Sequence, residues 1–133
     1  MKTANELFPK FRNPKWNYAT YEPIVKNMGE IVIESRDDDW QGDSRILYKD
    51  GTTYGFLRFG WGSCSGCDAL LACKTIEEVQ FLMDDLLSRI LWFDSKKAAL
   101  KFFKEHNWKM DHDGSKLELK KFVKDSLKYL SSI

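Results

Sequence analysis

The stretch RILYKDGTTYGFLRF, residues 45–59, decides the fold because a turn dipeptide joins two strand-like runs within it. Residues 45–49 and 52–59 are rich in β-branched and aromatic side chains, which favour strands. Asp50-Gly51 between them supplies the positive φ angles that a tight hairpin turn needs. The β-branched run at residues 30–35 precedes them, beyond a polar loop-like stretch, SRDDDWQGDS. We therefore predict a three-stranded antiparallel meander.

Helices are predicted on both sides of this meander along the chain. Thr75 followed by Glu78 forms a capping box, and apolar residues then recur every three or four positions to about residue 93. Asp94 or Ser95 begins a second helix, and Ser115 begins a third. Before the sheet, Asn17 is expected to cap a short helix over residues 18–27. The apolar positions expected in the core of the two long helices are Ile76, Val79, Met83, Leu86, Leu87 and Ile90, then Leu119, Phe122, Val123, Leu127 and Leu130.

The predicted fold class is α+β, with a small three-stranded sheet packed against one layer of about three to four helices. A chain of 133 residues with 43% hydrophobic content buries one ordinary core, so we expect a single domain over residues 1–133. Residues 1–16, with Pro9 and Pro14, are expected to form an irregular N-terminal arm.

Charge and hydropathy exclude several classes of function. The 21 basic and 20 acidic residues nearly balance, so attraction of the whole molecule to nucleic acid or an anionic membrane is not indicated. The chain lacks an N-terminal apolar signal region and any stretch of eighteen apolar residues, which predicts neither secretion nor membrane insertion. All 3 cysteines lie within ten residues, a pattern that suits reduced thiols or metal ligands. We expect a cytoplasmic protein without a membrane partner.

The segment GWGSCSGCDALLAC, residues 60–73, contains the only concentration of reactive residue types. Cys64, Cys67 and Cys73 could supply three ligands of a zinc ion, which Asp68, His106 or His112 could complete. A structural zinc site normally has a second ligand pair, and the sequence offers none, so the preferred prediction is no metal and no cofactor. Thiol exchange by the Cys64-x-x-Cys67 pair is disfavoured, because the preceding strands form an antiparallel hairpin rather than a βαβ unit.

A thiol enzyme remains as an alternative interpretation of this segment. Cys64 or Cys67 could act as a nucleophile, but no base is clearly placed to activate it. Cys67 lies at the start of a predicted short helix, CDALLAC, so it is expected to be the most reactive thiol, with Cys73 buried and inert. The glycine-rich backbone could also cradle an anion, although it matches neither standard phosphate-binding motif. The simplest explanation is geometric, with glycines that permit a sharp turn and serines that cap a helix.

Two charged regions are weaker candidates. Asp37, Asp38, Asp39 and Asp43 lack the ligand spacing of a calcium loop and are interpreted as a solvated acidic loop, as is DHDG at residues 111–114. Residues 94–133 contain ten lysines and six acidic residues, but no arginine. Lysine without arginine usually indicates a solvated helix face, so nucleic-acid binding by these helices ranks below a protein partner.

The run YGFLRFGWGSCSGCDALLAC, with WQGD upstream of it, resembles a pattern found in small uncharacterised proteins of bacteriophages and bacteria. The resemblance covers residues 40–73, about a quarter of the chain, and it implies no particular activity. It implies a phage origin and a role in modulating a host factor. It also implies that residues 62–68 belong to a signature, and we take as candidate binding residues Trp61, Gly62, Ser63, Cys64, Ser65, Gly66, Cys67 and Asp68.

The sequence therefore favours a binding protein over an enzyme. A binding module requires no matched acid, base and nucleophile, and no such set is visible in the sequence. We expect the segment at residues 60–68 to shape or form the surface that contacts a macromolecular partner, most directly a protein.

Overall fold

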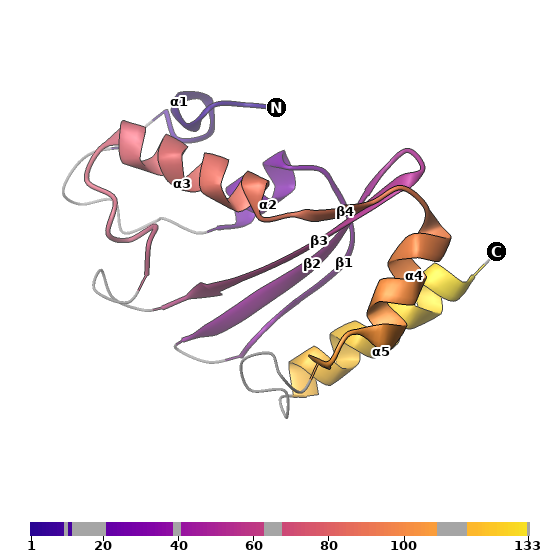
Figure 1. Ribbon diagram of the computed structural model, residues 1–133. Helices are drawn as coiled ribbons and strands as arrows, with labels where there is room; N and C mark the ends of the chain where they lie inside the picture. Colours follow the sequence, from indigo (N-terminus) through magenta and orange to yellow (C-terminus); the bar gives the residue numbers. More distant parts are fainter. Residues whose placement is uncertain (10, 12–20, 39–40, 63–67, 109–116, 133) are drawn as a thin grey trace.

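A computed structural model of the chain describes residues 1–9, 11, 21–38, 41–62, 68–108 and 117–132 (Figure 1). Its centre is an antiparallel sheet of four strands that neighbour one another in chain order: β1 (Glu30–Arg36), β2 (Gly42–Asp50), β3 (Thr53–Trp61) and β4 (Leu91–Phe93). Five helices accompany it among the described residues: α1 (Ala4–Leu7), α2 (Glu22–Asn27), α3 (Ile76–Ser88), α4 (Lys96–Glu105) and α5 (Leu117–Ser131). The predicted α+β class is confirmed, whereas the predicted three strands and three to four helices are corrected to four strands and five helices among the described residues.

The helices form two layers rather than the single layer predicted from the sequence. Figure 1 shows α1, α2 and α3 on one face of the sheet and α4 and α5 on the other. Adjacent residues of β2 belong to different cores: Ile46 and Tyr48 pack with α1–α3, and Leu47 between them packs with α4 and α5. The buried run over residues 43–48 of β2 has this cause, since a strand covered on both faces buries consecutive side chains.

The hairpin is confirmed, with a shift of its turn by one residue. Asp50 pairs with Thr53, so the two central residues are Gly51 and Thr52 rather than Asp50 and Gly51. Gly51 has φ 61°, a left-handed conformation that glycine adopts without strain. The Thr53 hydroxyl donates to the Asp50 carbonyl at 2.8 Å across the turn. The Asp-Gly dipeptide therefore predicts that a hairpin turn forms here, but it does not specify which two residues occupy the centre of the turn.

The predicted loop at residues 35–44 is wrong at both ends. Arg36 continues β1 one residue beyond the predicted strand at residues 30–35, and residues 42–44 already belong to β2, where Ser44 pairs with Arg36. These residues are polar, yet they occupy strands because pairing between β1 and β2 satisfies their backbone groups.

The fourth strand replaces the end of the long helix predicted to reach residue 93. The Thr75 cap is confirmed, with Glu78 N–H donating to the Thr75 hydroxyl at 3.1 Å, but α3 ends at Ser88. Residues 91–93 then pair with residues 54–56 of β3. Ile90 is buried as predicted, together with Val79, Met83 and Leu86, whereas Ile76 and Leu87 are only partly buried. The helical spacing of apolar residues continues in the sequence past the end of α3, because Ile90, in the connection to β4, packs in the same core as α3.

The last two helices follow their predicted pattern. Ser95 caps α4, its hydroxyl accepting from Ala98 N–H at 3.0 Å. In α5 the predicted stripe faces the core formed with α4, where Phe122 and Leu130 are buried and Val123 and Leu127 are partly buried. Leu119 is buried as well. The predicted helix start at Ser115 lies outside the described residues.

The N-terminal region is more regular than the predicted arm. A capping box between Thr3 and Glu6 begins α1, and Ala4 is buried in the core beneath it. The helix predicted over residues 18–27 is described from Glu22, with Pro23 in its first turn, and the predicted cap Asn17 lies outside the described residues.

Candidate functional site

The end of β3 is joined to the following turn by the carboxylate of Asp68, which is 6% exposed. Its Oδ2 accepts from Gly62 N–H at 2.9 Å, just beyond the last residue of β3. Its Oδ1 accepts from the backbone N–H groups of Leu70 at 2.8 Å and Leu71 at 3.1 Å. One side chain therefore holds the chain on both sides of the segment at residues 63–67.

Tyr21 completes the donor set around this carboxylate. Its hydroxyl donates to Asp68 Oδ1 at 2.9 Å and accepts from Leu70 N–H at 3.1 Å, while its ring packs on Phe59 with centroids 4.8 Å apart. Burial raises the pKa of Tyr21 above its usual value, and the Asp68 charge raises it further. The phenol therefore stays protonated and keeps donating. With four donors around it, Asp68 is suited to fixing a loop rather than to accepting a proton from a nucleophile.

Cys73 lies in a turn and not in the short helix predicted for CDALLAC. Ala72 N–H donates to Asp68 O at 3.0 Å and Cys73 N–H to Leu70 O at 3.1 Å, which makes one turn that does not continue. The Cys73 thiol is buried and donates to Ala69 O at 3.3 Å. Burial, supported by the charges of Glu78 and Asp68, raises the pKa of Cys73. The prediction that Cys73 is buried is confirmed, and a protonated thiol there is a packing group.

The same turn removes the argument for an unusually reactive Cys67. That prediction relied on the N-terminal dipole of a helix beginning near residue 67, and a single turn aligns too few peptide units to supply it. Ser63, Cys64, Ser65, Gly66 and Cys67 themselves lie outside the described residues, so the nucleophile and anion-cradle interpretations stay predictions.

Trp61 is the described aromatic side chain of the predicted binding segment. It is half-buried against the core shared with α1–α3, and its indole Nε1–H donates to the Ser44 hydroxyl at 3.0 Å. A tryptophan fixed in this way presents a rigid surface beside Gly62.

His106, one of the three candidate fourth ligands in the zinc alternative, lies on the opposite face of the sheet from Cys73. The His106 ring stacks on Phe102 with centroids 4.9 Å apart and meets Trp108 edge-on, and both partners belong to the α4–α5 core. Cys73 belongs to the core on the opposite face, so His106 and Cys73 do not meet. Within the described ranges no three His, Cys, Asp or Glu side chains gather as metal ligands, while Cys64, Cys67 and His112 fall outside them.

A buried ionic cluster replaces part of the predicted acidic loop. Asp37 and Asp43 are each 4% exposed and Arg45 is 1% exposed. Arg45 Nη1 lies 3.0 Å from Asp37 Oδ1, Asp37 Oδ2 accepts from Asp43 N–H at 2.9 Å, and Arg58 Nη1 lies 3.2 Å from Asp43 Oδ1. The alternation of Asp43 and Arg45 on one face of a strand is the signal that sequence analysis overlooked.

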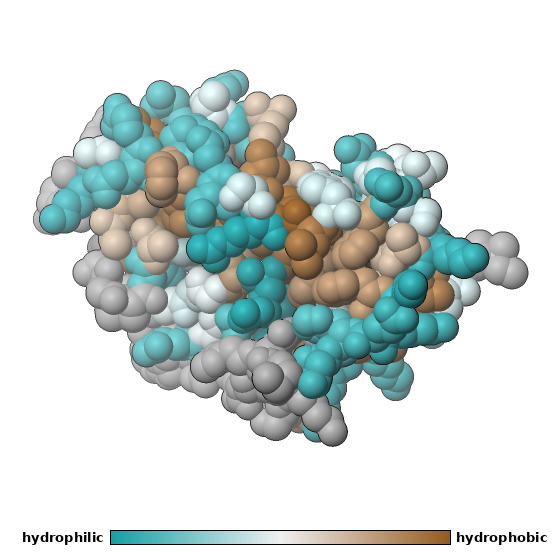
Figure 2. Space-filling view, viewed as in Figure 1, coloured by the Kyte–Doolittle hydropathy of each residue, from teal (hydrophilic) through white to brown (hydrophobic). Residues whose placement is uncertain are grey.

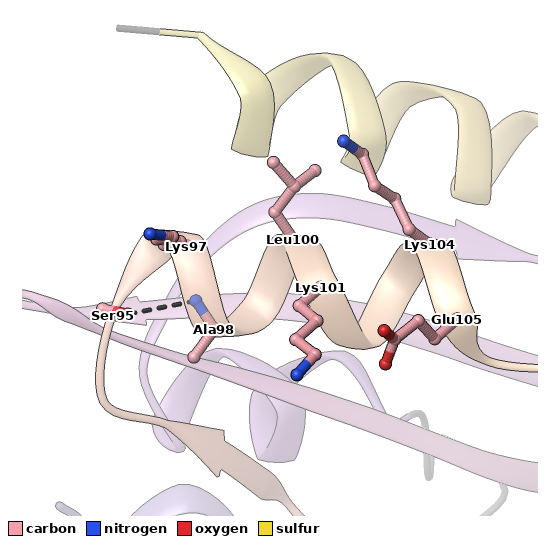
Figure 3. Close-up of a pocket in the computed structure, with 7 residues that line it drawn as sticks. All are labelled: Ser95, Lys97, Ala98, Leu100, Lys101, Lys104 and Glu105. Carbon is pink, nitrogen blue, oxygen red and sulfur yellow. Dashed lines mark hydrogen bonds between the residues drawn. The ribbon is translucent and has the colours of Figure 1, made fainter.

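The lysine-rich helices present a shallow hollow on the outer surface of α4. Its volume is about 560 Å3, and it is lined by Ser95, Lys97, Ala98, Leu100, Lys101, Lys104 and Glu105. Figure 3 shows Leu100 and Lys104 pointing toward α5, whereas Ala98, Lys101 and Glu105 project from the other side of α4. The hollow combines ammonium groups with the apolar surface of Ala98 and Leu100.

Comparison of the chain with protein-family models, curated proteins and solved structures finds no match. No described helix combines the length and apolar character needed to span a bilayer.

Proposed function

We propose that this chain is a small binding protein that acts through a macromolecular partner, most directly a protein. In this proposal the segment between Gly62 and Asp68 lies at the contact surface, and the phage origin and host-factor role implied by the resemblance belong to the same hypothesis. The cytoplasm is the compartment that suits the clustered cysteines, of which Cys73 is a free thiol.

The observation that carries the proposal is the hydrogen bonding of Asp68. A buried carboxylate with four donors is held firmly, and it fixes Gly62 and Leu70 on either side of the segment. Recognition segments are commonly loops held by a rigid scaffold, because fixed ends reduce the entropy lost on binding. The candidate catalytic bases do not favour an enzyme. The Asp68 carboxylate already accepts four hydrogen bonds, and His106 packs on the opposite face of the sheet.

Affinity capture from the source cells with matched tryptophan variants tests the contact surface. Ser65→Trp adds bulk within the segment, and Thr52→Trp adds the same bulk to the exposed hairpin turn at the other end of β3. A protein retained by the wild-type chain and by Thr52→Trp, but lost with Ser65→Trp at an unchanged melting temperature, supports the proposal. Equal retention by both variants would remove the segment from the contact surface.

Alkylation kinetics of single-cysteine variants test the thiol-enzyme alternative. A binding segment predicts that Cys64 and Cys67 react with iodoacetamide at the rate of ordinary exposed thiols at neutral pH. A rate for either one that greatly exceeds this and is independent of pH near neutrality would instead indicate a stabilised thiolate. Protection of both that a chelator abolishes would indicate zinc.

A further inference from the structure

The two edges of the sheet differ in how they are protected. Edge strands in soluble proteins are usually blunted by charges, prolines or bulges that oppose the addition of another strand. At one edge, β1 has an irregularity between Ile31 and Ile33 and charged residues at Glu30, Glu34 and Arg36. At the other edge, β4 consists of Leu91, Trp92 and Phe93 alone, without charge, proline or bulge. Short length also protects an edge, and β4 has only three residues, but of the two edges β4 alone lacks charge, proline and bulge.

The side chains of β4 form an apolar surface that is open to solvent. Leu91 is 50% exposed and Trp92 is 43% exposed. Trp92 is held in place, because its ring lies over Gly55, where an added Cβ would come within 2.8 Å of Trp92 Cε3. Figure 2 shows the hydrophobic side chains gathered in a band over β4, between α3 and α4. The band is therefore a formed surface and not a pair of loose side chains.

Each face of this edge meets a helical layer of different charge. Strand alternation places Leu91 on the face of Phe56, toward α4 and α5, and Trp92 on the other face, toward α3. Among the described residues of 94–108 and 117–132, eight lysines and four acidic residues give the α4–α5 layer a net charge of +4. Residues 1–29 and 68–90, the parts of the sequence that contain α1, α2 and α3, have seven basic and seven acidic side chains, so they carry no net charge.

We propose that β4 accepts an extended segment of a partner protein as an additional strand, with acidic side chains at alternate positions. The acidic side chains would face α4, where Lys97 and Lys101 line the hollow (Figure 3). The apolar side chains would face Trp92. The proposal goes beyond the proposed function, since Trp61 and Gly62 lie at the opposite end of β3 from the residues that pair with β4.

Charge disfavours a second copy of the chain as the occupant. Antiparallel pairing of two β4 strands requires a two-fold axis normal to the sheet, which keeps each layer on its own side. The lysines of α4 would then meet the lysines of the other α4. Like charges across an interface oppose association. Nucleic acid is also disfavoured, because α4 and α5 contain no arginine and present apolar surface between the lysines.

Titration with a fluorescent peptide of alternating glutamate and valine tests this proposal. As an added strand, the peptide would place every glutamate on one face and every valine on the other. We expect saturable binding below about 1 mM, weakened at least tenfold by Leu91→Glu, which opposes the glutamates at the edge. The peptide with lysine in place of glutamate should bind the wild-type chain weakly and the Leu91→Glu variant more tightly.

Phe81→Glu is the matched control, because it adds the same charge at a side chain that is 76% exposed on α3. It should leave glutamate-peptide binding within about twofold of the wild type. Backbone amide resonances of Leu91 and Phe93 should shift on binding and gain protection from hydrogen exchange. Leu91→Glu and Phe81→Glu both replace exposed side chains, and a thermal melt of each variant should be recorded to check that it is folded.

Four outcomes would overturn the proposal. The first is no binding at about 1 mM peptide, and the second is an equal loss in Leu91→Glu and Phe81→Glu. The third is a dimer in sedimentation that Leu91→Glu dissociates, which would assign the edge to a second copy. The fourth is binding of single-stranded DNA that Lys101→Glu abolishes and Leu91→Glu leaves unchanged, without peptide binding.

Discussion

Two buried carboxylates, Asp68 and Asp37, hold the chain in contrasting ways at the same end of the hairpin. Asp68 is surrounded by neutral donors, three from the backbone and one from Tyr21. Asp37 faces the guanidinium of Arg45, whose Nε and Nη2 find no hydrogen-bond partner among the residues that the structure describes. At Asp68, neutral hydrogen-bond donors stabilise the carboxylate, whereas at Asp37 a buried positive charge balances it.

The difference shows what each site contributes. Dipoles cost little to bury, because backbone N–H groups at a turn need partners in any case, so the Asp68 site positions the chain at Gly62 with little penalty. A buried ion pair must offset the desolvation of both charges, and unsatisfied donors reduce its net contribution. The Asp37–Arg45 pair therefore adds little net free energy to folding, but burying either charge without the other would destabilise the fold.

The largest expected effect is that of Arg45→Ala. Removing the guanidinium takes away the cation that lies 3.0 Å from the buried Asp37 carboxylate, and we expect the free energy of unfolding to fall by about 3–5 kcal/mol in urea denaturation. The double variant Arg45→Met, Asp37→Asn removes both charges and keeps an acceptor for Asp43 N–H, so it should be markedly more stable than Arg45→Ala. A loss below about 1 kcal/mol for Arg45→Ala would place solvent at the pair and contradict its burial.

Asp68→Asn should have the next largest effect. An amide offers one acceptor and one donor, so either Gly62 N–H or the donors on the other oxygen lose their partner. We expect a loss of about 2 kcal/mol in the free energy of unfolding, measured by urea denaturation. Because the lost contact holds Gly62, amide hydrogen exchange at that residue should accelerate more than exchange in α4. Uniform acceleration across the molecule would mean that Asp68 does not act locally.

Tyr21→Phe tests how the hydroxyl that donates to Asp68 contributes to the stability of the protein at alkaline pH. The hydroxyl donates to Asp68, and its removal should cost about 1 kcal/mol at neutral pH. The pKa of Tyr21 is raised in the folded protein above its value of about 10 in the unfolded chain, so its contribution is complete below pH 10 and is lost as pH rises above it. Thermal melts between about pH 9 and 11 should therefore show a shallower alkaline decline for Tyr21→Phe than for the wild type.

Tyr48→Phe provides the comparison for that experiment. The pKa of Tyr48 is also raised by burial, but its hydroxyl donates to Val25 O and not to a carboxylate. Its variant should also flatten the alkaline decline while leaving hydrogen exchange at Gly62 unchanged. If both variants retain the full decline, groups other than these two phenols must cause it.

Local signals in the sequence predicted the features that depend on near neighbours. The hairpin, the Thr75 and Ser95 caps and the stripe of α5 each arise from residues a few positions apart. The fourth strand was missed because Ile90 extends the helical spacing, and a three-residue strand shows too little alternation to compete with it. The second helical layer was missed although the three consecutive apolar residues of β2, Ile46, Leu47 and Tyr48, indicated a strand covered on both faces.

The candidate site was predicted only in part, for the same reason. Asp68 belonged to the predicted binding segment, but its partner Tyr21 is 47 residues away, and no local pattern pairs them. Asp37 and Asp43 were interpreted as solvated because aspartates in a polar run usually are. Their burial depends on Arg45 and Arg58, which lie directly opposite each other across β2 and β3. Cross-strand pairing of this kind is fixed by register and not by composition.

The smallest expected effect belongs to Arg58→Met, which tests whether charge or packing dominates at the open side of the ionic cluster. The Arg58 side chain is 36% exposed and its partner Asp43 6%, so water screens the arginine far more than it screens Arg45. Methionine keeps the apolar stem on β3, and the expected loss in the free energy of unfolding is about 0.5–1 kcal/mol. Salt should distinguish the two arginines, because the loss caused by Arg58→Met should shrink toward zero at about 1 M NaCl, while that of Arg45→Ala persists. Equal sensitivity of both losses to salt would show that the two arginines are similarly hydrated and would remove the contrast between the partly exposed Arg58 and the buried Arg45.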